Sequence, residues 1–258
     1  MRAFALASTA LLVCATAVAA QDIAGHLAAG DAARCQRNAQ QALTHYRAAL
    51  ALDSMHYDAN WKAARVLVDL GLLLPDAQKA RRDTLYLDAR ALAERAVHVN
   101  ANGADGHYMV AVAVGRVALT KGARERVRYA SVIRDEALRA TELNPRHDGA
   151  LHVLGRWNAE IQRLSGITKF FAKTFLGASV FNQATWENAE SYFTQAVNND
   201  PQNIYHHLDL AETLVDMDKP AEARTHLEQV GTLPLGCDPM DPTYKQQAAT
   251  LLQRLTRP

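Results

Sequence analysis

Apolar residues recur along this chain at helical spacing, with small and large side chains in a fixed order. The stretch WENAESYFTQAVNNDPQN, residues 186–203, places Ala189, Phe193 and Ala196 on one face and ends at Asp200-Pro201. Residues three or four apart share a face of a helix, so the stretch predicts an amphipathic helix. The same order recurs at Ala42, Tyr46 and Ala49, at Ala89, Ala93 and Ala96, at Ile133, Ala137 and Ala140, and at Ala223, Leu227 and Val230.

The copies that begin at Ala189 and at Ala223 lie 34 residues apart, which is the period of a tetratricopeptide repeat. In such a repeat the small positions let two helices approach closely, and the large one fills the groove between them. The preceding helices carry matching pairs, Leu154-Gly155 and Leu210-Ala211, and strand-like alternation is almost absent. The sequence therefore predicts an all-α, tetratricopeptide-like helical-repeat solenoid of about five helix pairs.

Insertions and a final helix complete the predicted solenoid. Insertions are expected at residues 72–84, 120–129 and 165–183, and in solenoids they map to loops on one face, often the binding face. Residues 241–258 predict a C-terminal capping helix with Asp241 as its cap and Pro242 at its first position. A terminal helix with one polar face keeps a solenoid soluble.

The N-terminal stretch has the pattern of an export signal. Arg2 is followed by an uninterrupted apolar run that closes with small residues at Ala17, Ala19 and Ala20. We expect a signal peptide over 1–20, cleavage after Ala19 or Ala20, and one repeat domain over 21–258 in a periplasmic or secreted protein. A lipidated Cys14 is a minor alternative, since the preceding residue is not small. No later segment reaches the ~20 apolar residues that a membrane span needs.

Charge and cysteine content narrow the function further. Without residues 1–20 the chain has 27 basic and 27 acidic residues, and this balance argues against a nucleic-acid surface. Cys35 and Cys237 then remain, close to opposite ends of the chain. An elongated solenoid would hold these residues far apart, so we expect free or intermolecular thiols.

Three stretches resemble a narrower family, the regulator of microtubule dynamics proteins. They are LHVLGRW, with Leu154, Gly155, Arg156 and Trp157, ATWENAESYFTQAVNNDPQN, and YASVIRDEALRATELNP, so that the resemblance covers roughly residues 57–233. Members are similar to tetratricopeptide solenoids with a long helix after this motif and an aromatic-glycine turn, here Phe175 and Gly177 without the usual prolines. The resemblance implies the fold and leaves the partner open, because an exported protein does not meet cytoplasmic tubulin.

No catalytic constellation stands out. Nucleophile elbows, Walker loops and dinucleotide fingerprints are absent from the sequence. His206-His207 is the only adjacent histidine pair, and neighbouring residues on a helix face different ways. We therefore predict no metal site, no cofactor and no enzymatic activity.

Two clusters are candidates for binding, each with a simpler reading. Lys121, Arg124, Arg126 and Arg128 surround Glu125, which suits an anionic ligand but is more typical of a solvated loop. Phe171 and Phe175 share a helix face within the 165–183 insertion and could contact a partner, although packing on the neighbouring repeat is more common.

The first helices of the pairs line the concave face of such a solenoid. The repeat register directs six side chains into it: Lys62, Tyr108, Arg116, His152, Arg156 and Glu212. Lys62 matches one position of a carboxylate clamp known from chaperone-binding repeats, but Val66 replaces its asparagine, so the clamp is not expected. Arg116 and Arg156 offer planar forks that suit carboxylates.

We therefore predict a non-enzymatic scaffold that binds an unidentified protein or peptide partner. The alternative is an enzyme or accessory subunit with a small-molecule pocket under the 165–183 insertion.

Overall fold

The computed structural model describes residues 21–164 and 179–256 of the chain, and none of these residues lies in a strand. The first helix is described over residues 21–35. The further elements are α2 (Ala39–Leu52), α3 (Tyr57–Leu72), the 3-10 turn η1 (Asp76–Gln78), α4 (Lys79–Val99), α5 (Ala104–Ala118), α6 (Ala123–Leu143), α7 (Asp148–Arg163), the 3-10 turn η2 (Ser179–Gln183), α9 (Trp186–Asn199), α10 (Ile204–Asp216), α11 (Pro220–Thr232) and α12 (Asp241–Thr256).

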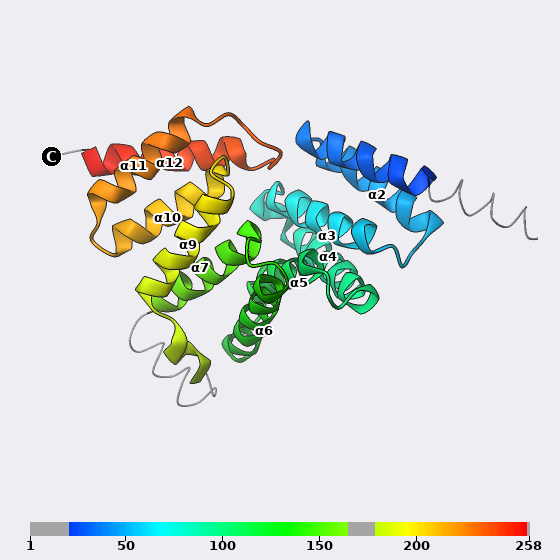
Figure 1. Cartoon of the computed structure of the whole chain (residues 1–258), viewed down its shortest axis with the longest axis horizontal. Coiled ribbons are helices and arrows are strands. Elements are labelled where there is room, and N and C mark those ends of the chain that lie inside the picture. Colours follow the sequence, from blue (N-terminus) through cyan, green and yellow to red (C-terminus); the bar gives the residue numbers. More distant parts are fainter. Residues whose placement is uncertain (1–20, 165–178, 257–258) are drawn as a thin grey trace, which may run out of the picture.

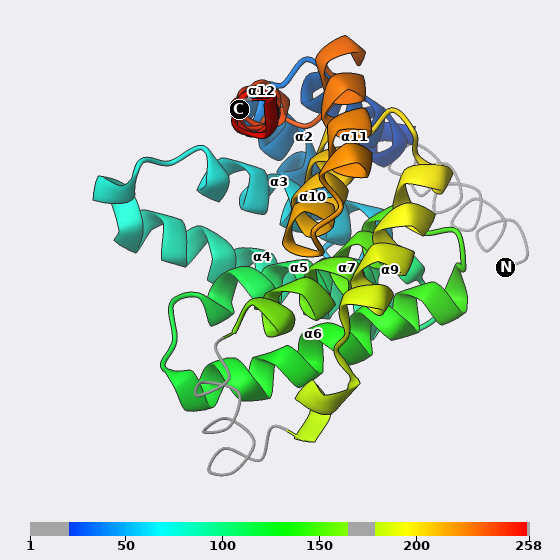
Figure 2. The same cartoon turned by 90° about the vertical axis from the view of Figure 1, so that its left-hand side faces the viewer.

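Consecutive helices pair as the repeat predicts. The second helices are α2, α4, α6, α9 and α11, and their small and large positions face the core. In α9, for example, Ala189 and Ala196 are 0% exposed and Phe193 is 1% exposed. Figure 2 shows the long helix α6 lying below α5 and α7. The all-α solenoid of about five helix pairs is confirmed.

Two of the three insertions form helix instead of loop. Residues 72–84 end α3, pass through η1 and begin α4, and residues 120–129 supply the first turns of α6. Both α4 and α6 reach 21 residues as a result. The basic cluster therefore lies on a helix, with Arg124, Arg126 and Arg128 exposed as the solvated reading expects. Most of the third insertion falls outside the described residues.

The terminal helix begins at Asp241, one residue before the predicted first position, and Asp241 has a different role from the predicted cap. Asp241 lies in the first turn of α12, and its Oδ2 accepts a hydrogen bond from the Gly236 backbone N–H at 2.7 Å. Its carboxylate therefore holds the loop before the helix. Tyr244 and Ala248 are buried on the apolar face, and Gln253 and Arg254 are exposed on the other.

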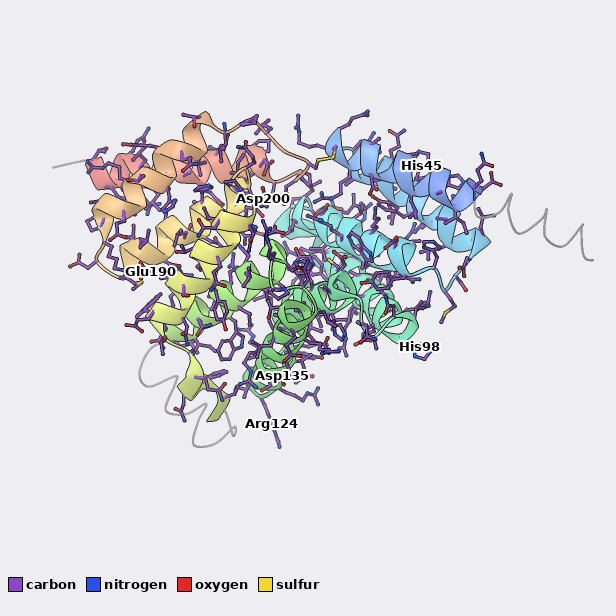
Figure 3. The ribbon with its side chains drawn as sticks, viewed as in Figure 1. His45, His98, Arg124, Asp135, Glu190 and Asp200 are labelled. Atoms are coloured by element: carbon purple, nitrogen blue, oxygen red, sulfur yellow. A yellow bond between two sulfur atoms is a disulfide. The ribbon has the colours of Figure 1, made fainter. Side chains whose placement is uncertain are left out.

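A disulfide joins the two ends of the solenoid, so the prediction of separated thiols is wrong. Cys35, at the end of the first helix, is bonded to Cys237 in the loop before α12, with their Cα atoms 3.9 Å apart. Nearby, Arg37 donates a hydrogen bond to the Gly236 carbonyl. The small rotation between repeats has accumulated into a curve that brings α12 back beside the first helix (Figure 1), and the sulfur bond is visible there in Figure 3.

Within residues 21–164 and 179–256, no helix is both long enough and apolar enough to cross a membrane.

Candidate functional site

The inner surface of the curve carries one side chain from each first helix at an equivalent position. In each pair this side chain follows a small residue that faces the second helix. At Gly155, an added Cβ atom would stand 2.8 Å from the ring of Phe193. We call the side chains that follow the small residues the ladder residues: Asp31, Arg65, Arg116, Arg156 and Glu212. The three in the middle are arginines, so these positions are cationic at the centre and acidic at both ends.

The register predicted for α3 is shifted by one residue. Val66 is 0% exposed and belongs to the core, whereas Arg65 follows the buried Ala64 and is partly exposed. Lys62 lies at the edge of the inner surface, where its Nζ forms an ion pair with Asp31 at 2.5 Å. Both line a hollow of about 170 Å³ beside Cys35. The inner cation of α3 that sequence reasoning missed is therefore Arg65.

Arg65 and Arg116 make no hydrogen bond and no close ion pair with any residue in the described ranges. Burial opposes the charged form of Arg65, but Tyr108 and Asp69 favour it, and its pKa is raised. Arg116 lies near tyrosines from other helices. Burial raises the pKa of Tyr86 and Tyr205, and the positive charge of Arg116 reduces this rise. These two guanidinium groups keep their hydrogen-bond donors available for a ligand.

Tyr108 forms part of the wall beside them. Its ring lies 4.8 Å from the His147 ring and against Gly149, where an added Cβ would come within 2.8 Å. Burial raises the pKa of its hydroxyl, so Tyr108 stays neutral. That Tyr108 supplies apolar contact to a partner stays a prediction.

Arg156 and His152 also lie on α7, but they are already bonded to α10. Arg156 Nη1 lies 3.1 Å from Asp209 Oδ2 and donates to the Tyr205 hydroxyl. His152 Nε2 lies 3.1 Å from the same carboxylate oxygen. Burial lowers the pKa of His152 to about 4. Burial alone would raise the pKa of Asp209, but Arg156 and His152 outweigh it and the pKa is lowered.

The contacts continue from His152 across to the start of α7. His152 Nδ1 lies 2.9 Å from His206 Nδ1, and His206 Nε2 lies 2.9 Å from Asp148 Oδ2. We call Asp148, His206, His152, Asp209 and Arg156 the α7–α10 relay. It joins two first helices through polar side chains, of which His152, His206 and Asp209 are buried. Sequence reasoning missed the relay because its partners stand more than 50 positions apart.

Glu212 is the last ladder residue. Together with Arg163 and Arg254 it lines a groove between α10 and α12 that has a volume of about 680 Å³. Burial and the nearby Asp209 raise the pKa of its carboxyl group. Arg163 is itself paired with Asp216 at 2.8 Å. Phe171 and Phe175, the remaining candidates, lie outside the described residues.

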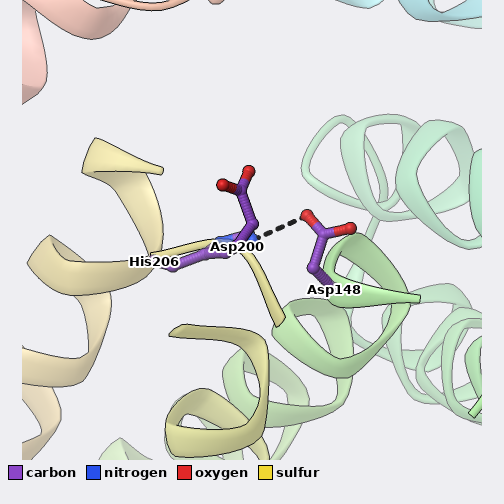
Figure 4. A group of neighbouring side chains, drawn as sticks. All are labelled: Asp148, Asp200 and His206. Carbon is purple, nitrogen blue, oxygen red and sulfur yellow. Dashed lines mark hydrogen bonds and ion pairs between the residues drawn. The ribbon is translucent and has the colours of Figure 1, made fainter. Parts of the chain in front are cut away.

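Among the residues that the structure describes, one cluster could hold a metal ion, which the sequence did not predict. Asp148, Asp200 and His206 place one ligand atom each within 4.8 Å of the others (Figure 4). They come from the start of α7, the end of α9 and the first turn of α10. The signal available in the sequence was the stacking of adjacent repeats, which brings their helix ends together.

The family model described as regulator of microtubule dynamics protein 1-3 matches residues 26–256. The chain belongs to this family. Regulator of microtubule dynamics protein 1 of Bos taurus is 26% identical over 165 residues, which cover 64% of this chain and 49% of the relative. Protein 3 of Bos taurus is 30% identical over 139 residues, which cover 54% of this chain and 29% of the relative. The chain thus spans about half the length of protein 1 of Bos taurus and less than a third of the length of protein 3.

Solved structures show the same fold. A thermophilic tetratricopeptide-repeat protein of Thermus thermophilus superposes with a TM-score of 0.64 at 18% identity, covering 90% of this chain and 99% of that one. The pilF protein of Pseudomonas aeruginosa superposes with a TM-score of 0.52 at 14% identity, covering 92% and 93%. Both confirm the tetratricopeptide-like fold.

Proposed function

We propose that this protein is a non-enzymatic scaffold outside the cytoplasm, which binds a protein or peptide partner on its inner surface. The observation that carries the proposal is the pair Arg65 and Arg116. They occupy equivalent positions on successive first helices and form no hydrogen bond or ion pair with a described residue, while Arg156 and Lys62 on the same surface are paired.

The chemistry of this surface favours a partner that presents carboxylates. A guanidinium group offers a planar fork of donors that matches a carboxylate. Arginine and tyrosine are also the residue types that most often dominate interface energetics. Arg65 and Arg116, with Tyr108 beside them, therefore supply the anionic anchors and apolar contact expected of a peptide groove. Arg156, already bonded to Asp209, contributes mainly by holding α7 against α10.

Two observations support an extracytoplasmic location. Residues 1–20 have the pattern of a signal peptide. The Cys35–Cys237 disulfide suits an oxidising compartment, where such bonds persist. The microtubule role in the relatives' name is not part of the proposal, since an exported protein does not meet tubulin. N-terminal sequencing of the native protein should find Gln21 or Ala20, and an intact Met1 contradicts export.

Affinity capture from the native extracytoplasmic fraction tests the binding surface. The Arg65→Ala/Arg116→Ala protein should lose a partner that the wild type captures, with an unchanged melting temperature. The matched control is Arg47→Ala/Arg95→Ala, which removes two exposed arginines of the second helices α2 and α4. Loss of the partner in Phe171→Ala/Phe175→Ala alone moves the site to the insertion and overturns the proposal.

A further inference from the structure

Three side chains from consecutive helix ends converge beside the α7–α10 relay. Asp148 is the first residue of α7, Asp200 caps the end of α9, and His206 lies in the first turn of α10. Their ligand atoms all lie within 4.8 Å of one another. Both aspartates are half-buried, and His206 is 4% exposed (Figure 4). A buried imidazole and two carboxylates are a donor set that binds metal ions.

The two ring nitrogens of His206 face different neighbours. Its Nδ1 lies 2.9 Å from His152 Nδ1, on the side of the relay. Its Nε2 lies 2.9 Å from Asp148 Oδ2, on the side of the two carboxylates. Nε2 is therefore the nitrogen placed to bind an ion between Asp148 and Asp200.

His206 and Asp148 already contact one another through this nitrogen, and Asp200 is the third member of the group. A metal ion at this point would replace the hydrogen bond between His206 and Asp148 with a bond from each of these side chains to the ion. The two carboxylates would balance the charge of a divalent cation.

We propose that Asp148, Asp200 and His206 bind a divalent first-row transition metal ion, of the class represented by zinc. Calcium and magnesium prefer sites made of oxygen ligands alone, whereas an imidazole nitrogen with carboxylates suits zinc and its neighbours. Three protein ligands leave a coordination position for water or a partner's side chain. The proposal is independent of partner binding on the inner surface.

The relay supplies the outer support that metal sites need. A ligating histidine usually donates its second N–H to a group that fixes the ring, and such outer partners strengthen the site. Here His206 Nδ1 lies 2.9 Å from His152 Nδ1, His152 Nε2 lies 3.1 Å from Asp209, and Asp209 is paired with Arg156. The ion would join the end of α9 and the starts of α7 and α10, so it would tie adjacent repeats together.

Metal titration of the purified chain tests the proposal. All proteins begin at Gln21, so that Cys14 is absent, and are treated with chelator and then dialysed. Zn²⁺ is titrated by calorimetry, and Co²⁺ is followed by its visible absorption. The wild-type sequence should bind one ion at this site and melt at a higher temperature with Zn²⁺. Asp200→Asn and His206→Gln should weaken binding at least tenfold.

Asp218→Asn is the matched control, since Asp218 lies exposed in the turn after α10 and its left-handed backbone accepts asparagine. It should bind the ion like the wild type. If His206→Gln fails to fold, Asp200→Asn decides, because asparagine can still accept the backbone hydrogen bond from Gln202 in that turn. No uptake, equal uptake by all variants, or tighter binding of Mg²⁺ than of Zn²⁺ overturns the proposal.

Discussion

Two aspartate–arginine pairs with buried aspartates join first helices of this solenoid, and the pKa values of their carboxyl groups shift in opposite directions. Asp69 of α3 pairs with Arg34 at 3.0 Å, and Asp209 of α10 pairs with Arg156 at 3.1 Å. Burial raises the pKa of Asp69 despite its arginine, and Asp238 adds to the shift. The pKa of Asp209 is lowered because His152 adds to the effect of Arg156.

The difference lies in what surrounds each pair. Asp238 belongs to the loop that the disulfide fixes beside the first helix, so the disulfide places a second negative charge near Asp69. Near Asp209 lies His152 instead, which lowers the pKa of the Asp209 carboxyl group further. The comparison teaches that two ion pairs of similar length can stabilise a fold to different extents, because burial and the nearby charges also act on each carboxylate.

The largest effect should come from removing the Cys35–Cys237 disulfide, which holds the loop before α12 near Asp69. Cys35→Ala/Cys237→Ala removes a link between residues 202 positions apart and should cost about 2–5 kcal/mol of unfolding free energy. Denaturant titration measures this loss, with Arg47→Ala, an exposed change on α2, as the control. A double variant as stable as the wild type would show that the ends are held together without the disulfide.

Asp209→Asn should be the next most damaging change. It removes the carboxylate that holds Arg156 and His152, and we expect a loss of about 2–3 kcal/mol, below the range for fully buried pairs because Arg156 is partly exposed. Hydrogen exchange should show the loss of protection centred on α7 and α10. Unchanged stability would contradict the role given to the relay.

Asp69→Asn should cost less than half as much, about 1 kcal/mol. Asparagine keeps an oxygen for Arg34 and removes a charge that burial and Asp238 disfavour. The same denaturant titration compares it with Asp209→Asn. A cost equal to that of Asp209→Asn would remove the difference between the two pairs.

The smallest expected effect is on how the stability loss of each variant depends on pH, and the two aspartates should show opposite dependences. The stability that Asp209 contributes is present above its unfolded pKa of 3.8 and is lost as the pH falls through its lower folded value. The contribution of Asp69 is present below 3.8 and is lost as the pH rises through its higher folded value. The penalty of Asp209→Asn should therefore shrink in acid, while that of Asp69→Asn should grow. Unfolding curves from pH 7 to 3 test both signs.

The sequence predicted what is local to one repeat. Small and large positions such as Ala189 and Phe193 are set by the contact of a helix with its partner, and they are buried as expected. The ring closure could not be predicted, since it is the sum of small rotations over all the repeats. The α3 register was missed by one residue because Ala63 and Ala64 are both small and buried, so either could mark the close contact.

The candidate site was predicted in part for the same reason. Arg116 follows a clear small residue, Gly115, and lies on the inner surface without a close charged partner among the described residues. The relay and the proposed metal site join side chains from different repeats, such as Asp148 and His206. No spacing within one helix encodes these contacts.

Site-specific photo-crosslinking tests the central claim, binding on the inner surface, most directly. A benzophenone amino acid at Val112, one helical turn before Arg116 on α5, is compared in the native compartment with one at Arg47 on the outer side of α2. The account predicts a cross-linked partner from position 112, lost when Arg65 and Arg116 are changed to alanine, and none from position 47. A partner cross-linked from position 47 alone, or from neither position, would contradict it.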